Sequence, residues 1–511
     1  MNTSAGRLAA RSRTQPVRGQ GRAHLVASSQ RLFDLFPARV RGHRARREEV
    51  AVNLEQLRKQ AKELVRAARA GDGTALARLG ELKPILANGQ LVLAREHGYS
   101  SWPALVHALE ANLESFVVAA TEGRRGRAEA LLAARPELER DPWAWLVLGR
   151  GWNGGPNEPG GPRGWSPLHY VCHSAFASVP LARELLERGA DPNAYYANEY
   201  GPMSVLYGAA GVLHDPELTA LLLRSGADPN GEPRRGDALY HACEAESTEC
   251  LRLLLEHGAE PNGTNALAHA LDYERLTHVR LLLDAGAEPN EGALLAHAVR
   301  RGRGSELVRL LAEHGADLDA LGGETWRGDV PLRTAYQHAM LRGRLDVAET
   351  LAGLGASTEV APADLAIAAV TRGEQPERWL PPELDPDAQE VLILTALAGR
   401  VDLVVELVGV DFRGVVGGSP EGTLLHHAAW VGNPDIVARL LAAGSDAAAT
   451  SFATYSTPLG CAALGSQYHL LPGRDYVAVA ELLVQAGAEI EPRFLDVAEG
   501  ELAAWLEERR G

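Results

Sequence analysis

One pattern of apolar and polar positions recurs through most of the chain. An apolar pair, usually Leu-Leu, is followed by glycine and then by Ala-Asp/Glu-Pro-Asn, and this phrase ends at Asn193, Asn230, Asn262 and Asn290. Looser copies place the same glycine at Gly315, Gly355, Gly444 and Gly487. The leucines indicate the buried stripe of a helix, and the glycine is typical of the left-handed residue that ends one. We therefore expect a series of helices, each followed by a tight turn.

A second kind of helix is predicted after these turns. Segments 166–172, 423–429 and 457–463 read SPLHYVC, TLLHHAA and TPLGCAA, and small residues such as Ala428 and Ala429 allow neighbouring helices to approach closely. Successive glycines of the phrase lie mostly 28 to 43 residues apart, and one interval of 89 holds a further degenerate unit around Gly409. Helix pairs repeated at such a period predict a solenoid, in which each unit buries its apolar face against the next.

The units resemble the ankyrin repeat, whose consensus reads TPLHxAA, a second helix and then GADVN. The resemblance covers roughly residues 165–491, with a degenerate opening unit at 116–138. It implies an all-α fold: an ankyrin-repeat solenoid of helix pairs joined by β-turn fingers. It also implies a protein partner but supplies no ligand. His169 and His426 match the motif histidine, which in the family helps to hold the turn by hydrogen bonds.

Five segments are expected along the chain. They are a disordered basic tail (1–50), a small helical domain (51–113), a degenerate first repeat with a Gly/Pro-rich insertion (114–164), the array (165–491) and a C-terminal capping helix (492–511). The small helical domain resembles a segment that precedes ankyrin arrays in many bacterial proteins, and residues 54–72 have the apolar period of an amphipathic helix. The proline-rich segment 375–388 is expected to loop out of the array.

The first 50 residues differ from the rest in charge. They hold 11 Arg and three acidic residues, which gives this stretch a net charge of +8. Because the net charge of the whole chain is −15, the remaining residues together carry −23. They lack a lasting apolar period, which predicts disorder. One hypothesis is that translation starts at Val50 or Val52, so that this stretch is not made. The alternatives are an Arg-rich arm for an anionic surface, or an organelle transit peptide, which the composition resembles.

Composition narrows the function classes. A net charge of −15 argues against nucleic acid as the partner, because phosphate contacts need clustered cations. No apolar run reaches the ~18 residues of a membrane span. Four cysteines are too few for a disulfide framework and match no zinc spacing. The strong bias for Arg over Lys is typical of a GC-rich bacterial genome. We expect a monomeric, cytoplasmic, bacterial protein without a cofactor.

Two motifs suggest chemistry, and both are discounted. GRGWNG (149–154) fits a dinucleotide-binding glycine pattern but runs into Gly and Pro residues where a helix should open, so a flexible loop is expected. His241, His269 and His297 occupy one column of the repeat, 28 residues apart. Stacked helices lie roughly 8–10 Å apart, whereas zinc ligands lie about 2 Å from the ion. We therefore expect no metal there, and either a stacking or a partner-facing role.

The fingers provide the remaining candidates for partner binding. Several are long and hold aromatic residues or Arg, the types enriched at interface hot spots. The candidates are Tyr195, Tyr196, Tyr200, Trp326, Arg327, Phe452 and Tyr455, together with His241, His269 and His297. The alternative is that these rings pack on adjacent fingers and stiffen the array. The expected function is a non-catalytic protein–protein interaction module or scaffold. The alternative is a small-molecule or metal-dependent enzyme that uses the N-terminal region or the 113–165 insertion.

Overall fold

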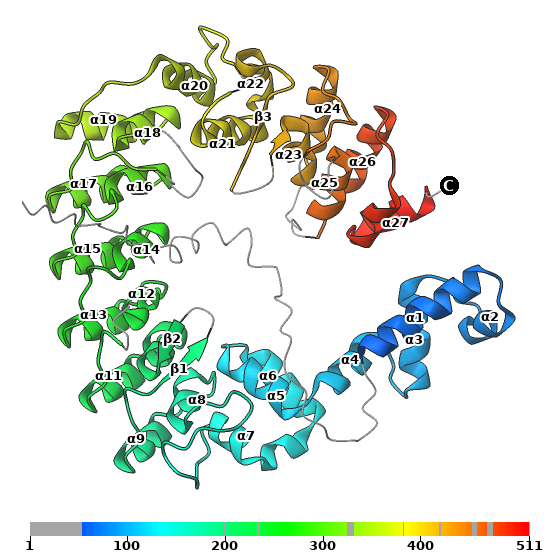
Figure 1. Cartoon of the computed structure of the whole chain (residues 1–511), viewed down its shortest axis with the longest axis vertical. Coiled ribbons are helices and arrows are strands. Elements are labelled where there is room, and N and C mark those ends of the chain that lie inside the picture. Colours follow the sequence, from blue (N-terminus) through cyan, green and yellow to red (C-terminus); the bar gives the residue numbers. More distant parts are fainter. Residues whose placement is uncertain are drawn as a thin grey trace, which may run out of the picture.

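The computed structural model describes residues 54–198, 201–231, 236–323, 332–381, 383–417, 421–451, 457–467 and 474–509. In this part of the chain, helices follow one another in an array that bends into an open ring (Figure 1). One row of helices lines the inner side of the ring, and a second row lies on the outer side. The tail expected at 1–50 lies outside the described residues.

Four helices precede the array. They are α1 (Leu54–Arg69), α2 (Gly73–Leu79), α3 (Leu86–Glu96) and α4 (Trp102–Glu110). The amphipathic period of α1 buries Leu57, Ala61 and Leu64. Helix α3 crosses α1 closely at Gly89, where a Cβ atom would lie only 2.9 Å from the carbonyl oxygen of Ala61. The glycine therefore lets the two backbones touch.

The array consists of helix pairs. The first helices of the pairs are α5 (Leu113–Thr121), α8 (Pro167–His173), α10 (Val205–Tyr207) with a π-helical continuation (Gly208–Val212), α12 (Asp237–Ala242), α14 (Ala266–Asp272), α16 (Leu294–Arg300), α18 (Ala335–Leu341), α21 (Pro386–Thr395) with a π-helical continuation (Ala396–Arg400), α23 (Leu424–Trp430) and α25 (Pro458–Gly465). The second helices are α6 (Arg125–Ala134), α9 (Val179–Glu187), α11 (Pro216–Arg224), α13 (Glu249–Glu256), α15 (Leu276–Asp284), α17 (Ser305–Glu313), α19 (Leu345–Leu354), α22 (Val401–Val408), α24 (Pro434–Ala442) and α26 (Tyr476–Gln485). Most first helices line the inside of the ring (Figure 1).

The repeated phrase has the predicted structural role. Leu254 and Leu282 of the second helices are fully buried. The glycines that follow, Gly258 and Gly286, both have φ of +90°, the left-handed conformation that ends a helix at little cost only in glycine. The pattern therefore identified both the buried stripe and the helix end.

An asparagine side chain connects each of these turns to the next. Asn193 Nδ2 donates to the carbonyl oxygen of Gly226 at 2.9 Å, and Asn193 Oδ1 accepts from the backbone N–H of Asp228 at 2.6 Å. The same pair of bonds recurs at Asn230, Asn262 and Asn290. These side chains form a ladder along the array, because each satisfies two backbone groups of the following unit.

The ladder begins earlier than the sequence indicated. Asn157 Nδ2 donates to the Gly189 carbonyl oxygen at 2.7 Å, and Asn157 Oδ1 accepts from the Asp191 N–H at 2.8 Å. The motif at 149–154 was expected to be a flexible loop. It does form a loop, but this loop is held in place, because Arg188 donates to the carbonyl oxygen of Trp152 at 2.6 Å and Asn157, just after the motif, bonds to the turn of the next unit.

Two units have a single helix. Helix α7 (Pro142–Val147) packs between α5 and α8, and α20 (Pro362–Arg372) packs between α18 and α21. After α20 the chain runs in extended form, with Leu380 buried and its N–H bonded to the carbonyl oxygen of Leu407. The prediction that 375–388 loops out is therefore only partly correct. Trp379 is exposed, but the end of the segment turns inward and starts α21.

A buried polar cluster lies where two apolar cores meet. One core runs from Ala111 to Ala356 and the other from Leu341 to Leu506. Near their junction Arg333, 6% exposed, makes two hydrogen bonds to Asp364 (2.8 and 3.0 Å) and two to Asp385 (2.7 and 3.0 Å). Both carboxylates are thus paired with one guanidinium, in the bidentate geometry that suits it.

Strands occur only as short hairpins in the described residues. β1 (Tyr195–Asn198) pairs antiparallel with β2 (Gly201–Ser204), and β3 (Arg413–Gly414) pairs with β4 (Gly422–Thr423). A 3₁₀ turn (Pro492–Asp496) and α27 (Gly500–Glu508) follow the last pair. In Figure 1, α27 lies across the opening of the ring from α1, and Glu507 pairs with Arg69 at 2.8 Å. None of the described helices combines the length and apolar character needed to cross a bilayer.

Candidate functional site

The β1–β2 finger places its two tyrosines differently. Tyr196 lies half-buried, with its ring stacked on Trp165 at 4.3 Å between centroids. Tyr195, on the opposite face of the strand, is 56% exposed. Successive side chains of a strand alternate between faces, so the packing of Tyr196 directs Tyr195 to solvent. The stiffening alternative therefore applies to Tyr196, and Tyr195 remains available to a partner.

The remaining finger candidates belong to three fingers. Tyr200, Trp326, Arg327, Phe452 and Tyr455 lie outside the described residues. The base of the 322–333 finger is described, and there Gly322 and Arg333 form an antiparallel bridge.

The column histidines lie on the inner row and contact acidic residues. His241 Nδ1 lies 2.8 Å from Glu244 Oε1, and His269 Nε2, from the next unit, lies 2.9 Å from the same oxygen. Glu244 directly follows α12 and its C-cap. Its side chain and that of His241 are about 30% exposed (29% and 30%), whereas that of His269 is 7% exposed.

This geometry corrects one step of the sequence reasoning. The separation of helix axes was taken as the separation of the imidazole donors. In the structure the ring centroids of His241 and His269 are 6.2 Å apart. Their ligating nitrogens and the Glu244 oxygen all lie within 4.8 Å of one another. Side chains on adjacent helices lean together, so two histidines of the column do share an acidic partner.

The third column histidine has a different environment. His297 Nε2 lies 3.0 Å from Asp272 Oδ1, and Arg301 Nε donates to that same oxygen at 2.9 Å. Burial raises the pKa of Asp272, but the hydrogen bond from His297 and the charge of Arg301 outweigh it and bring the pKa to about 2. A guanidinium therefore already neutralises this carboxylate.

Aromatic residues hold His269 in position. The Tyr240 ring stacks on His269 at 3.7 Å between centroids, and Tyr273 meets the same imidazole edge-on at 5.0 Å. Tyr207 contacts His241 edge-on, also at 5.0 Å. Three successive units thus contribute one tyrosine each to this cluster, which restricts the rotamers of both histidines.

Sequence reasoning missed Glu244 beside the column histidines and missed His338 as a further member of the column. Glu244 stands three residues after His241, a spacing that was present in the sequence and not used. His338 belongs to the same column in the unit AYQHAM, and it is fully buried with Nε2 3.0 Å from the carbonyl oxygen of Gly322. His427, also in the column, makes the equivalent contact to the carbonyl oxygen of Gly414 at 3.1 Å. His338 and His427 are therefore buried, and each contacts the backbone at the base of a finger.

The remaining sequence motifs have structural roles. His426 Nδ1 lies 2.8 Å from the Thr423 hydroxyl, and His169 Nδ1 lies 2.9 Å from the Ser166 hydroxyl, so both fix the start of a first helix. After GRGWNG the next helix begins only at Pro167, and the helix N-terminus that a dinucleotide site requires is not formed there. All four cysteines are free thiols.

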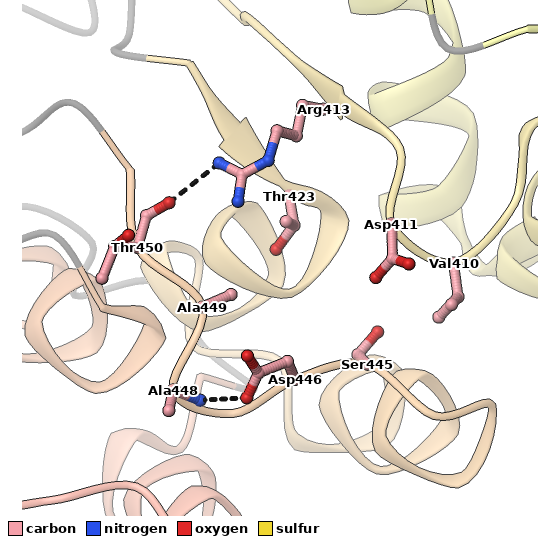
Figure 2. A pocket seen from close by; sticks show the side chains of 9 residues that line it. All are labelled: Val410, Asp411, Arg413, Thr423, Ser445, Asp446, Ala448, Ala449 and Thr450. Atoms are coloured by element: carbon pink, nitrogen blue, oxygen red, sulfur yellow. Dashed lines mark hydrogen bonds between the residues drawn. The ribbon is translucent and has the colours of Figure 1, made fainter.

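A hollow of about 330 Å³ lies between the β3–β4 finger and the turn after α24. Figure 2 shows its lining, in which the Asp411 carboxylate and the Ser445 hydroxyl face each other. Arg413 donates to the Thr450 carbonyl oxygen at 2.8 Å and closes one side. Among the described residues that line it, none is aromatic and most are polar or alanine, so this part of the lining lacks the apolar character of most small-molecule pockets.

Comparison with known families supports the interpretation of the repeats. A model of three ankyrin-repeat copies matches residues 206–293, and the single ankyrin-repeat model matches 163–195 and 422–451. The chain contains ankyrin repeats. Together with the helix pairs described above, this confirms the predicted fold class, an all-α ankyrin-repeat solenoid.

Two known proteins are similar to part of this chain. The transient receptor potential channel pyrexia of Drosophila melanogaster is 34% identical over 114 residues, which is 22% of this chain and 11% of the channel. The crystal structure of the ankyrin repeat domain of Bcl-3, a member of the IkappaB protein family, is 28% identical, with a TM-score of 0.31 over 38% of this chain and 87% of that domain. Ankyrin repeats suggest protein partners of unspecified identity.

Proposed function

We propose that this protein is a non-catalytic interaction module or scaffold that binds a protein partner through the finger tips and the inner row of helices. The observation that carries the proposal is the exposure of Tyr195 on a finger whose neighbouring ring, Tyr196, is packed. An exposed aromatic side chain on a stiff support loses little conformational entropy when a partner covers it. Tyrosine is also among the residue types that dominate interface energetics.

The setting of this module follows from composition. We propose a monomer in the cytoplasm of a bacterium, on the Arg-rich composition, the four free thiols and the acidic net charge. The same charge supports a partner other than nucleic acid. The helices α1–α4 supply a separate surface, on which Leu76, Ile85 and Leu86 are exposed.

Site-specific photo-crosslinking in the native host tests the proposal. A photoreactive phenylalanine analogue is placed at position 195 and, in a matched chain, at position 379. Trp379 is an equally exposed aromatic residue, 60% exposed, and lies beside Gly409 at the end of the outer helix α22. We expect a discrete protein adduct from position 195 and none from 379. Adducts from position 379 alone would contradict the proposal.

Affinity then provides the second measurement. Once the crosslinked partner is identified, Tyr195→Ala is expected to weaken its binding by roughly 30-fold, the size of a hot-spot contact. Trp379→Ala is expected to leave the dissociation constant unchanged. An equal loss from both variants would place the interface elsewhere.

A further inference from the structure

The cluster of His241, Glu244 and His269 has the donor atoms of a metal centre. Two imidazole nitrogens and one carboxylate oxygen converge from two adjacent units, with nitrogen–oxygen distances of 2.8 and 2.9 Å. Two histidines and a glutamate are a known ligand set for Zn²⁺ with one coordination position left open. Imidazole and carboxylate donors also suit other divalent first-row transition metals.

We propose that His241, Glu244 and His269 bind one divalent transition metal ion, with Zn²⁺ as the best fit, on the inner face of the array. Tetrahedral donors about 2.1 Å from an ion lie roughly 3.4 Å from one another. The two nitrogen–oxygen distances must therefore widen by about half an ångström, and the donors already lie within 4.8 Å of one another. Side-chain rotations alone cover such a change.

The proton balance is simple. In the metal-free arrangement each imidazole donates a proton to Glu244 from the nitrogen that would ligate the ion. Neutral histidine can carry its single proton on either ring nitrogen. Metal binding therefore moves that proton to His241 Nε2 and His269 Nδ1, and the carboxylate exchanges two hydrogen bonds for one metal bond.

The ring positions favour this site over a flexible surface cluster. Tyr240 and Tyr273 hold the His269 imidazole between neighbouring units, so little freedom is lost when it ligates. The partial exposure of His241 and Glu244 lets an ion enter from the inside of the ring. The same exposure leaves room for water, or for a side chain of another molecule, as the fourth ligand.

The neighbouring unit provides an internal comparison. Shifting the cluster by 28 residues gives His269, Asp272, His297 and, at the position of Tyr273, Arg301. Arg301 donates to the Asp272 oxygen at 2.9 Å, where a metal ion would otherwise approach. A guanidinium that is bonded to the carboxylate repels a second cation. The nearby Arg275 donates instead to the backbone oxygen of Glu244, at 3.5 Å. A metal site is therefore expected between the units of His241 and His269 and not between those of His269 and His297. His297 can serve as the control.

Titration of the full-length chain with Zn²⁺ tests the site. After dialysis against a chelator, calorimetry is expected to show one tight site per chain. Glu244→Gln keeps an acceptor for both histidines and so the apo fold, but removes the charged ligand. It is expected to lower the Zn²⁺ affinity by about 100-fold or more. Tyr273→Arg, which copies the Arg301 arrangement, is expected to lower it as well. Thermal melts check that each variant folds.

The matched control is His297→Gln, in the same column one unit further along. It is expected to leave the Zn²⁺ affinity unchanged. Titration with Co²⁺ adds a spectroscopic readout, because visible absorption bands of low-coordinate Co²⁺ are expected in the wild type and absent in Glu244→Gln. Failure of the wild type to bind Zn²⁺, or an equal loss in His297→Gln and Glu244→Gln, would overturn the proposal. The isolated chain suffices, so the outcome is independent of the proposed protein partner.

Discussion

Replacing Asn230 with alanine removes one link of the asparagine ladder. The side chain is 8% exposed and makes two hydrogen bonds to the following unit: Nδ2 to the Gly258 carbonyl oxygen at 3.2 Å, and Oδ1 from the Glu260 N–H at 2.7 Å. Each such bond contributes about 0.5–1.5 kcal/mol net. We therefore expect Asn230→Ala to lower the free energy of unfolding by about 1–3 kcal/mol.

The loss should appear at one interface. In a solenoid, stability is close to a sum of unit terms and nearest-neighbour terms, so a weakened joint separates the two sides of the array. Urea unfolding followed by circular dichroism is expected to show a broader transition as well as a lower midpoint. Hydrogen exchange of the Glu260 amide is expected to accelerate, because this N–H loses its acceptor.

Asn230→Asp divides the effect between the two bonds. Aspartate still accepts from the Glu260 N–H but cannot donate to the Gly258 carbonyl oxygen. The chain already has an aspartate at the equivalent position of another unit, where Asp319 accepts from the Ser357 N–H at 2.8 Å. We expect Asn230→Asp to cost about half as much as Asn230→Ala and to leave exchange at Glu260 slow. A change below about 0.3 kcal/mol in Asn230→Ala would refute the assigned role of the ladder.

Three further predictions concern single residues. Arg333→Ala is expected to cost about 3–5 kcal/mol in urea unfolding, because it leaves Asp364 and Asp385 largely buried without their cation; a cost below 1 kcal/mol would contradict this. Ala293 has φ of +54°, so Ala293→Gly is expected to raise the free energy of unfolding by about 0.5–1 kcal/mol in thermal melts, and a decrease would argue against strain there. Burial lowers the pKa of His173 from 6.5 to about 3, so the unfolded chain binds a proton first and stability falls as pH drops from about 6.5 toward 3. His173→Gln is expected to reduce the loss between pH 7 and 5.5 by about 1.2 kcal/mol in paired melts, and an unchanged slope would refute the burial argument.

Local signals account for the part of the fold that the sequence predicted. In the four units that end at Asn193, Asn230, Asn262 and Asn290, the glycine after the second helix and the asparagine four residues later act within one turn and one joint, so their spacing is visible in the chain itself. Where a unit departs from the phrase, prediction failed. The Pro156-Asn157 dipeptide marked a true joint, but no Leu-Leu helix precedes it, because α7 has no second helix. The segment after α20 likewise replaces a helix with extended chain that buries Leu380.

The candidate site depended on contacts between units. Tyr195 and Tyr196 are neighbours of the same type, and the packing of Tyr196 on Trp165, His169 and His173, 23 to 31 residues earlier, decides which ring is exposed. Nothing in the local sequence fixes that choice, since shifting a strand by one residue would exchange the two faces. Prediction of the finger as a whole was possible, but prediction of its exposed face was not.

Equivalent histidines of the column have different chemical environments. Alignment found that His241, His269 and His297 are equivalent, and equivalence suggested that they share one role. Their chemistry is set instead by the residues beside them, since Tyr273 and Arg301 occupy the same position in successive units. Arg301 binds the acidic partner of His297, whereas Tyr273 packs against His269. The exchange of Arg301 for Tyr273 at one repeat position therefore distinguishes the ion-paired His297 from His269, a candidate metal ligand. The contacts of these two residues in the structure show the difference, which alignment of the repeats does not.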